Sequence, residues 1–196
     1  MSTQKKLNKK EQFTRKEKSR LPLIAVVLVV VLGAVFALNQ LTSTPEQADQ
    51  GYFGEPVTSP RSYMGRLVSM TPVKPAIGGD EIRIPLSEIE EKEIVSFEVA
   101  NDQGTLVPLM AYITPSGRVF AGSSMCEPCG GRTFSLAGET LVCDACRTTY
   151  TIETHEFISG SVVCGSYPPV NMQATVQGDF LVISLQKVLE WRIRAL

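Results

Sequence analysis

The clearest feature of the hydrophobic pattern is an uninterrupted apolar run near the N-terminus. Residues 21–38 contain no charged side chain and consist mostly of Leu, Val and Ala. A helix needs about 20 apolar residues to cross the hydrocarbon core of a bilayer, with about 17 as the lower end. The run therefore predicts one transmembrane helix over residues 21–38.

Beyond residue 80 the pattern changes to short segments, many of them alternating between apolar and polar positions. The pattern predicts strands over 81–85, 95–99, 109–114, 118–121, 140–142, 148–152 and 180–185. A helical turn is expected over 86–92, and the end of the chain, 188–196, reads as a final strand or a short helix. Pro115-Ser-Gly117 is a turn signal that joins two of the strands into a hairpin. This spacing is typical of a mainly β fold, a small antiparallel sandwich or barrel.

The segment between the apolar run and the strands is polar and rich in Pro and Gly, which is typical of a linker or stalk. The sequence therefore predicts a basic head (1–20), a transmembrane helix (21–38), a linker (39–79) and a metal-binding β domain (80–196).

Charge is distributed unevenly along the chain. Residues 1–20 carry eight basic and two acidic side chains, whereas the remaining 176 residues carry 11 basic and 18 acidic ones. Because Lys and Arg are retained on the cytoplasmic side, the head is expected inside the cell and the β domain outside, in a single-pass protein of the cell membrane. The acidic domain argues against nucleic acid. The competing interpretation is a cleaved signal peptide, although the apolar run is longer than a signal sequence needs.

The candidate chemistry lies in the cysteines. Cys126 and Cys129 form one Cys-x2-Cys pair, and Cys143 and Cys146 form a second pair thirteen residues later. A two-residue gap in a tight turn lets both thiolates point at one ion, so two such pairs supply four soft ligands for zinc or for an iron–sulfur centre. Outside the cell, structural disulfides are the alternative. The fifth cysteine, Cys164, is a further metal ligand, a ligand of a second ion or a buried thiol.

Several segments together resemble a known family. In chain order they are residues 82–89, residues 115–121, Cys126-Glu-Pro-Cys129, residues 138–146 and Cys164-Gly-Ser-Tyr-Pro168. This order is similar to that of the FtrD-like membrane iron–sulfur protein family, over about residues 80–190. The resemblance implies an iron–sulfur cluster or other iron centre, a place in ferrous iron uptake, and an iron permease or redox protein as partner.

The same order is also similar to a Rieske-type domain, with two ligand loops and a third, Gly/Pro-rich loop that covers the cluster. By that analogy Cys would stand at each His position, and residues 160–169 would form the covering loop. Ligation by cysteine alone would give a lower potential than that of a Rieske centre.

Other residues carry weaker signals. His155 is the only histidine and lies between polar neighbours, so it is expected at the surface. Arg147 and Tyr150 flank the second cysteine pair and either tune the site or serve the fold, and Trp191 is expected to pack in the core. No catalytic triad is evident, so we expect an electron-transfer or metal-binding protein rather than a stand-alone enzyme. The alternatives are a structural zinc ribbon-like interaction domain and a disulfide-stabilised domain.

Overall fold

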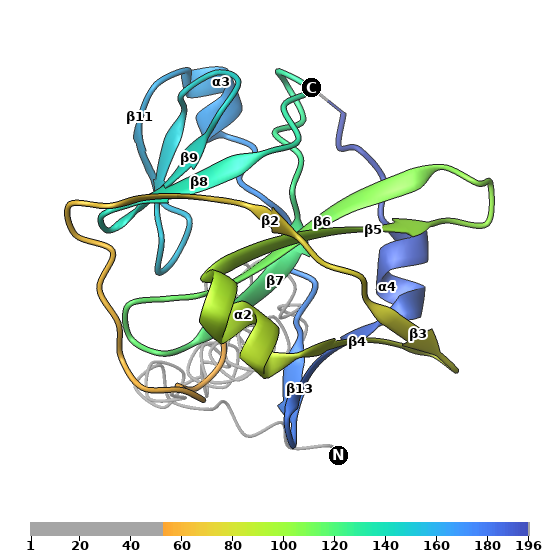
Figure 1. Cartoon of the computed structure of the whole chain (residues 1–196). Coiled ribbons are helices and arrows are strands. Elements are labelled where there is room, and N and C mark those ends of the chain that lie inside the picture. The colour runs from red at the N-terminus through yellow and green to blue at the C-terminus, as the bar shows by residue number, and fades with distance from the viewer. Residues whose placement is uncertain (1–52, 196) are drawn as a thin grey trace, which may run out of the picture. The chain divides into compact units, whose positions relative to one another are not determined.

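The computed structural model describes residues 53–195, and these residues form a mainly β fold of three sheets (Figure 1). In chain order the elements are β1 (Leu67–Ser69), β2 (Thr71–Pro72), β3 (Ala76–Gly78), β4 (Glu81–Pro85), α2 (Leu86–Lys92), β5 (Ile94–Ala100), β6 (Leu106–Ile113), β7 (Val119–Ser123), β8 (Phe134–Ala137), β9 (Thr140–Cys143), β10 (Thr149–Thr151), β11 (Phe157–Ser159), α3 (Val162–Gly165), β12 (Thr175–Gln177), β13 (Phe180–Ser184) and α4 (Leu185–Glu190).

The central sheet has the strand order β2-β5-β6-β7 and is buried on both faces. Strand β6 shows why. Its residues Leu109, Ala111 and Ile113 belong to one hydrophobic core, whereas Met110 and Tyr112 belong to the other. Successive side chains of a strand point to opposite faces, so a continuous apolar run fits a strand covered on both sides.

The outer sheet, with the order β12-β13-β4-β3, covers one face of the central sheet through the first core. Ile84 from β4 and Ile183 from β13 are fully buried there. Helices α2 and α4 contribute Ile89 and Val188 to the same core.

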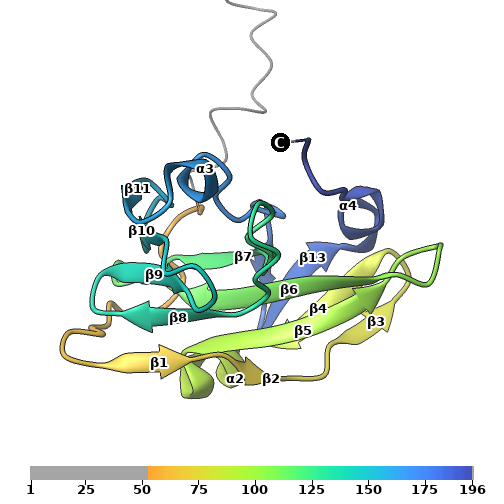
Figure 2. The same cartoon turned by 90° about the horizontal axis from the view of Figure 1, so that it is seen from above.

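The cysteine-bearing sheet, with the order β1-β8-β9-β10-β11, covers the other face through the second core. Phe134, Leu141 and Tyr150 of this sheet pack with Tyr112 and Phe120 of the central sheet. Figure 2 shows β8 and β9 gathered toward one side of the central sheet and β3, β4 and β13 toward the other. The cysteine site is therefore built on a small sheet, and this sheet packs against the two other sheets, which form a larger unit.

Most predicted elements are confirmed, among them the helix over 86–92 and the hairpin of β6 and β7, in which Ile113 pairs with Val119. The expected architecture is only partly right. None of the three sheets among the described residues closes on itself, so the barrel is wrong, and β2 pairs with β5 in parallel. Of the two alternatives for residues 188–196, the strand is wrong: helix α4 extends to Glu190, and the described residues after it are irregular.

Three short strands, β1 to β3, lie in the segment that the sequence assigned to a linker. Each has only two or three residues, and they pair with β8, β5 and β4 respectively, so β1 and β2 are ordered by partners farther along the chain. The predicted head and transmembrane helix lie outside the described residues. Among residues 53–195, no helix has the length and apolar character needed to span a bilayer.

Candidate metal centre

The two cysteine pairs lie in turns with the same hydrogen-bond pattern. In the first knuckle, residues 126–131, the Cys126 amide donates to the Gly131 carbonyl over 2.8 Å and the Gly130 amide donates to the Cys126 carbonyl over 2.8 Å. In the second knuckle, residues 143–148, the Cys143 amide donates to the Thr148 carbonyl over 2.9 Å. The Arg147 amide donates to the Cys143 carbonyl over the same distance. The two cysteine pairs therefore adopt the same type of turn.

Each knuckle needs left-handed backbone at its fifth residue. Gly130 has φ +73° and Arg147 has φ +60°. Glycine adopts this region freely, but a residue with a Cβ pays about 1 kcal/mol or more. A non-glycine residue held in this conformation, beside a group of cysteines, is a feature of a functional site. The residue that follows each cysteine pair, Gly130 or Arg147, therefore adopts the left-handed conformation that this turn requires.

The knuckles bring four sulfur atoms together. The Sγ atoms of Cys126, Cys129, Cys143 and Cys146 all lie within 4.8 Å of one another. Across the two knuckles, Cys126 Sγ is 3.8 Å from Cys146 Sγ, and Cys129 Sγ is 3.9 Å from Cys143 Sγ. These separations are too long for a disulfide bond, and all five cysteines in the described region are free. Four converging thiols are the donor set of zinc or of thiolate-bound iron.

The four thiols differ in exposure and acidity. Cys126 and Cys143 are buried, and burial is the main reason why the pKa of each is raised, that of Cys143 to about 11. Burial also opposes ionisation of Cys146, but its hydrogen bonds with Thr148 and with the neighbouring thiols lower its pKa to about 6. Cys129 is exposed. A bound cation would favour the thiolate at all four positions, because metal ligation requires the deprotonated sulfur.

Cys164 lies beside this group but not within it. It is 4% exposed and shares the second core with Cys126 and Cys143. Its backbone carbonyl accepts a hydrogen bond of 2.7 Å from the hydroxyl of Tyr150, which gives that tyrosine a structural role. The group of four mutually close sulfurs does not include Cys164, so its role as a ligand stays a prediction.

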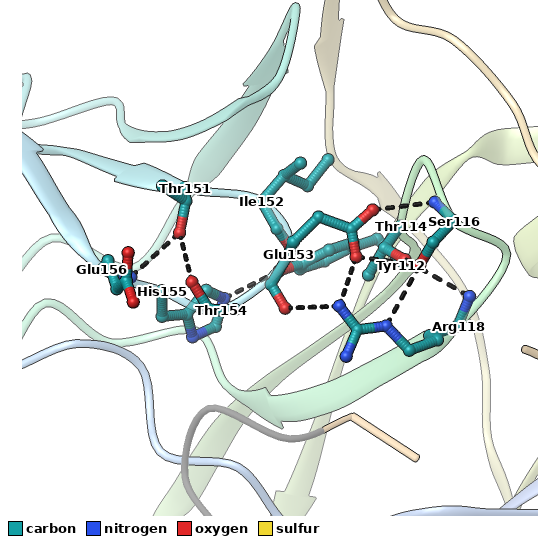
Figure 3. A network of polar contacts seen from close by, with 10 residues as sticks. All are labelled: Tyr112, Thr114, Ser116, Arg118, Thr151, Ile152, Glu153, Thr154, His155 and Glu156. Carbon is teal, nitrogen blue, oxygen red and sulfur yellow. Dashed lines mark hydrogen bonds and ion pairs between the residues drawn. The ribbon is translucent and has the colours of Figure 1, made fainter. Parts of the chain in front are cut away.

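His155 was predicted at the surface, and this prediction is wrong. The side chain is buried and its ring lies 4.5 Å from the ring of Phe120 and 5.0 Å from that of Phe53, centre to centre. Its Nε2 atom is 2.7 Å from the Tyr112 hydroxyl (Figure 3). The sequence does not indicate this burial, because the neighbours Thr154 and Glu156 are polar and the aromatic partners come from distant parts of the chain.

Burial of His155 predicts a loss of stability in acid. Burial lowers the pKa of its imidazole to about 3, whereas the unfolded value is about 6.5. The unfolded chain therefore binds more protons between these values, and the free energy of unfolding falls as the pH drops below 6.5, by up to about 1.4 kcal/mol for each pH unit. His155→Asn tolerates the left-handed backbone at this position (φ +58°) and does not titrate. Denaturant unfolding at several pH values should give a flatter pH dependence for the variant, and an unchanged slope would contradict the assignment.

A second feature of the site that the sequence did not reveal is Glu127, inside the first knuckle. Its side chain is fully buried, and its Oε2 accepts a 2.6 Å hydrogen bond from Arg194 Nε. Arg194 also donates to the Pro168 carbonyl over 2.7 Å. Arg194 therefore joins the first knuckle to Pro168, which lies in the predicted covering loop. The sequence near either residue does not predict this ion pair, because Glu127 and Arg194 are 67 residues apart.

Removing the arginine of this pair should destabilise the domain. Arg194→Met leaves the Glu127 carboxylate buried without its cation, and we expect a loss of about 2 kcal/mol in the free energy of unfolding. Arg192→Met is the matched control, since Arg192 is exposed and donates only to nearby backbone carbonyls. Its effect should stay within about 0.5 kcal/mol. Equal effects of the two variants in thermal unfolding would contradict a structural role for the pair.

A polar network fixes the cysteine-bearing sheet to the central sheet. Glu153, which follows β10, makes an ion pair of 2.5 Å with Arg118 and accepts a hydrogen bond of 2.7 Å from the Ser116 amide (Figure 3). Ser116 belongs to the turn that the sequence predicts between β6 and β7. Trp191 packs against the first core, as predicted, and Arg147 is exposed.

The comparisons with known proteins give one match. The profile of the family described as "Membrane iron-sulfur containing protein FtrD-like" matches residues 89–194, which is more than half of the chain and includes all five cysteines. Searches of curated proteins and of solved structures each returned no significant match. The chain belongs to the FtrD-like family of membrane iron–sulfur containing proteins.

Proposed function

We propose that this protein is a membrane-anchored redox protein whose metal centre is held outside the cell by Cys126, Cys129, Cys143 and Cys146. The observation that carries the proposal is the convergence of four thiols within 4.8 Å in two matching knuckles. Membership of a membrane iron–sulfur family favours iron as the metal. The proposed role is electron transfer or service to iron uptake rather than independent catalysis.

The residues of the site suit this role. Iron bound by thiolates would supply a one-electron couple. Cys126 and Cys143 are buried and would keep water from one side of the centre, whereas Cys129 is exposed and would bring the other side to the surface. The Gly131 amide donates to Cys129 Sγ over 3.4 Å, and such hydrogen bonds to sulfur raise the potential of a thiolate-bound iron. The backbone hydrogen bonds of both knuckles would keep the cysteine ligands in place when the iron is oxidised or reduced.

The proposed partners are the membrane and an iron permease or redox protein beside it. The basic head and the apolar run support an anchor with its N-terminus in the cytoplasm. The iron permease follows from the family resemblance alone. An exposed Cys129 is the position at which a partner would approach the centre most closely.

A Rieske-like arrangement of the loops is part of the same proposal. Two features support it: both knuckles flank strands of one small sheet, and a third segment lies against them. In that segment, Gly160 lies so close to Thr148 that an added Cβ would be 2.7 Å from the Thr148 Cα, and Cys164 shares a hydrophobic core with Cys126. A loop that covers the centre would be expected to lie in this position.

The second candidate function is a structural zinc site in an interaction domain. The specific observation in its favour is that four thiols at these distances also match the ligands of a closed zinc site. In that case the ion would stabilise the small sheet and take no part in electron transfer.

A redox titration tests the proposal. The full chain is purified in detergent without oxygen, and its metal content, visible absorption and midpoint potential are measured. We expect iron, a coloured oxidised form and reversible bleaching on reduction. Stoichiometric zinc without colour would replace the proposal by the zinc alternative, and a chain without metal would overturn both.

A further inference from the structure

The distances between the four sulfurs bear on how many metal atoms the centre holds. A metal–sulfur bond of about 2.3 Å in a tetrahedral site separates the sulfurs by about 3.8 Å. The two contacts across the knuckles, Cys126 to Cys146 and Cys129 to Cys143, measure 3.8 and 3.9 Å. All the remaining separations are at most 4.8 Å. The two printed separations match those of two ligands on one tetrahedral ion, and all four thiols lie close enough together to bind the same ion.

A cluster would need a different arrangement. A two-iron cluster binds two thiolates on each iron and places bridging sulfides between the irons, so thiolates on different irons lie farther apart than two ligands of one ion. Here no division of the four sulfurs into two pairs leaves the pairs separated, because all four are mutually close. Gly131 also lies close to sulfurs of both knuckles: a Cβ at this residue would lie 3.0 Å from Cys143 Sγ and 3.2 Å from Cys129 Sγ.

The backbone restrains the knuckles from moving apart. The Asp144 amide, in the second knuckle, donates to the carbonyl of Thr133, two residues beyond the first knuckle, over 3.1 Å. The Ser135 hydroxyl donates to the Asp144 carboxylate over 2.8 Å. Strand β9, which ends at Cys143, pairs with β8 at Phe134. Opening the site to admit sulfides would break these contacts.

We infer that the centre holds one metal ion, bound by Cys126, Cys129, Cys143 and Cys146, and that Cys164 is a buried neighbour rather than a ligand. This inference rests on the proposed function and narrows it to an isolated iron ion instead of a cluster. Four thiolates complete a tetrahedral ion, so a fifth sulfur has no coordination position to fill. Cys164 is buried in the same hydrophobic core as the ligand Cys126.

The experiment measures iron, zinc and acid-labile sulfide per chain in the anaerobically purified full chain, together with electron paramagnetic resonance of the oxidised form. We expect one iron, no sulfide and the high-spin signal of an isolated ferric ion. Two or more irons with equivalent sulfide would overturn the inference and leave the proposed redox function standing. One zinc without iron would support the single-ion geometry and overturn the redox function. No metal would overturn both.

A pair of variants tests the position of Cys164. Cys164→Ser and Cys164→Ala should each keep one metal ion per chain, with at most a shift in midpoint potential. The thermal unfolding of both variants is measured alongside, so that a chain that does not fold is recognised. Loss of the metal from a folded Cys164→Ala chain would overturn the inference that Cys164 is not a ligand.

Discussion

Replacing Cys143 by serine is expected to reduce the metal content from one ion per chain to less than a tenth of that value. Cys143 is fully buried at the end of β9, and its sulfur is 3.9 Å from Cys129 Sγ. A serine hydroxyl is a much poorer ligand than a thiolate for zinc or iron. Because binding free energy at such a site is also folding free energy, the variant should lose several kcal/mol of stability. Elemental analysis and thermal unfolding measure the two effects.

Thr140→Ser at the other end of β9 is the control for this substitution. Thr140 donates a hydrogen bond of 2.6 Å to the Ala137 carbonyl, and serine keeps the same hydroxyl. The control should retain the metal and nearly all of the stability. If Cys143→Ser kept a full complement of metal, the four-thiolate assignment would be wrong.

Gly131→Ala is expected to weaken metal binding at least tenfold, which corresponds to about 1.4 kcal/mol. The added methyl group would lie 3.0 Å from Cys143 Sγ, 3.2 Å from Cys129 Sγ and 2.9 Å from the Ala145 Cβ. The backbone of the facing knuckle is held by hydrogen bonds, so the two sulfurs would have to shift away from the positions that suit an ion. Competition with a coloured chelator of known affinity measures the change.

The matched control for Gly131→Ala is Gly78→Ala on β3. An added Cβ at Gly78 meets no atom within 4 Å, and its backbone is not in the left-handed region. Its metal affinity should equal that of the unchanged protein. Equal affinities for the Gly131 and Gly78 variants would show that the contact between the knuckles does not shape the site.

Local patterns explain which parts of the fold could be predicted. The strands that alternate, the turn at Pro115-Ser-Gly117 and the helix over 86–92 depend on neighbouring residues, and the structure contains them. The strands β1 to β3 could not be predicted, because two or three residues are too few to show a periodic pattern. The burial of β6 on both faces is visible only once two other sheets are placed.

The candidate site divides in the same way. The Cys-x2-Cys spacing is local, and it predicts knuckles whose backbone closes on itself. The positions of His155 and Glu127 depend on Phe53, Phe120 and Arg194, which lie tens of residues away. Histidine and glutamate are polar, so their side chains would be expected at the surface. Burial becomes favourable only because distant residues provide partners for them.

The most direct test of the four-thiolate centre is X-ray absorption at the metal edge of the anaerobically purified full chain. We expect four sulfur atoms at about 2.3 Å from the metal and no other ligand atoms, as in tetrahedral thiolate sites. A first shell containing nitrogen or oxygen, or fewer than four sulfurs, would contradict the assignment of Cys126, Cys129, Cys143 and Cys146 as the ligands.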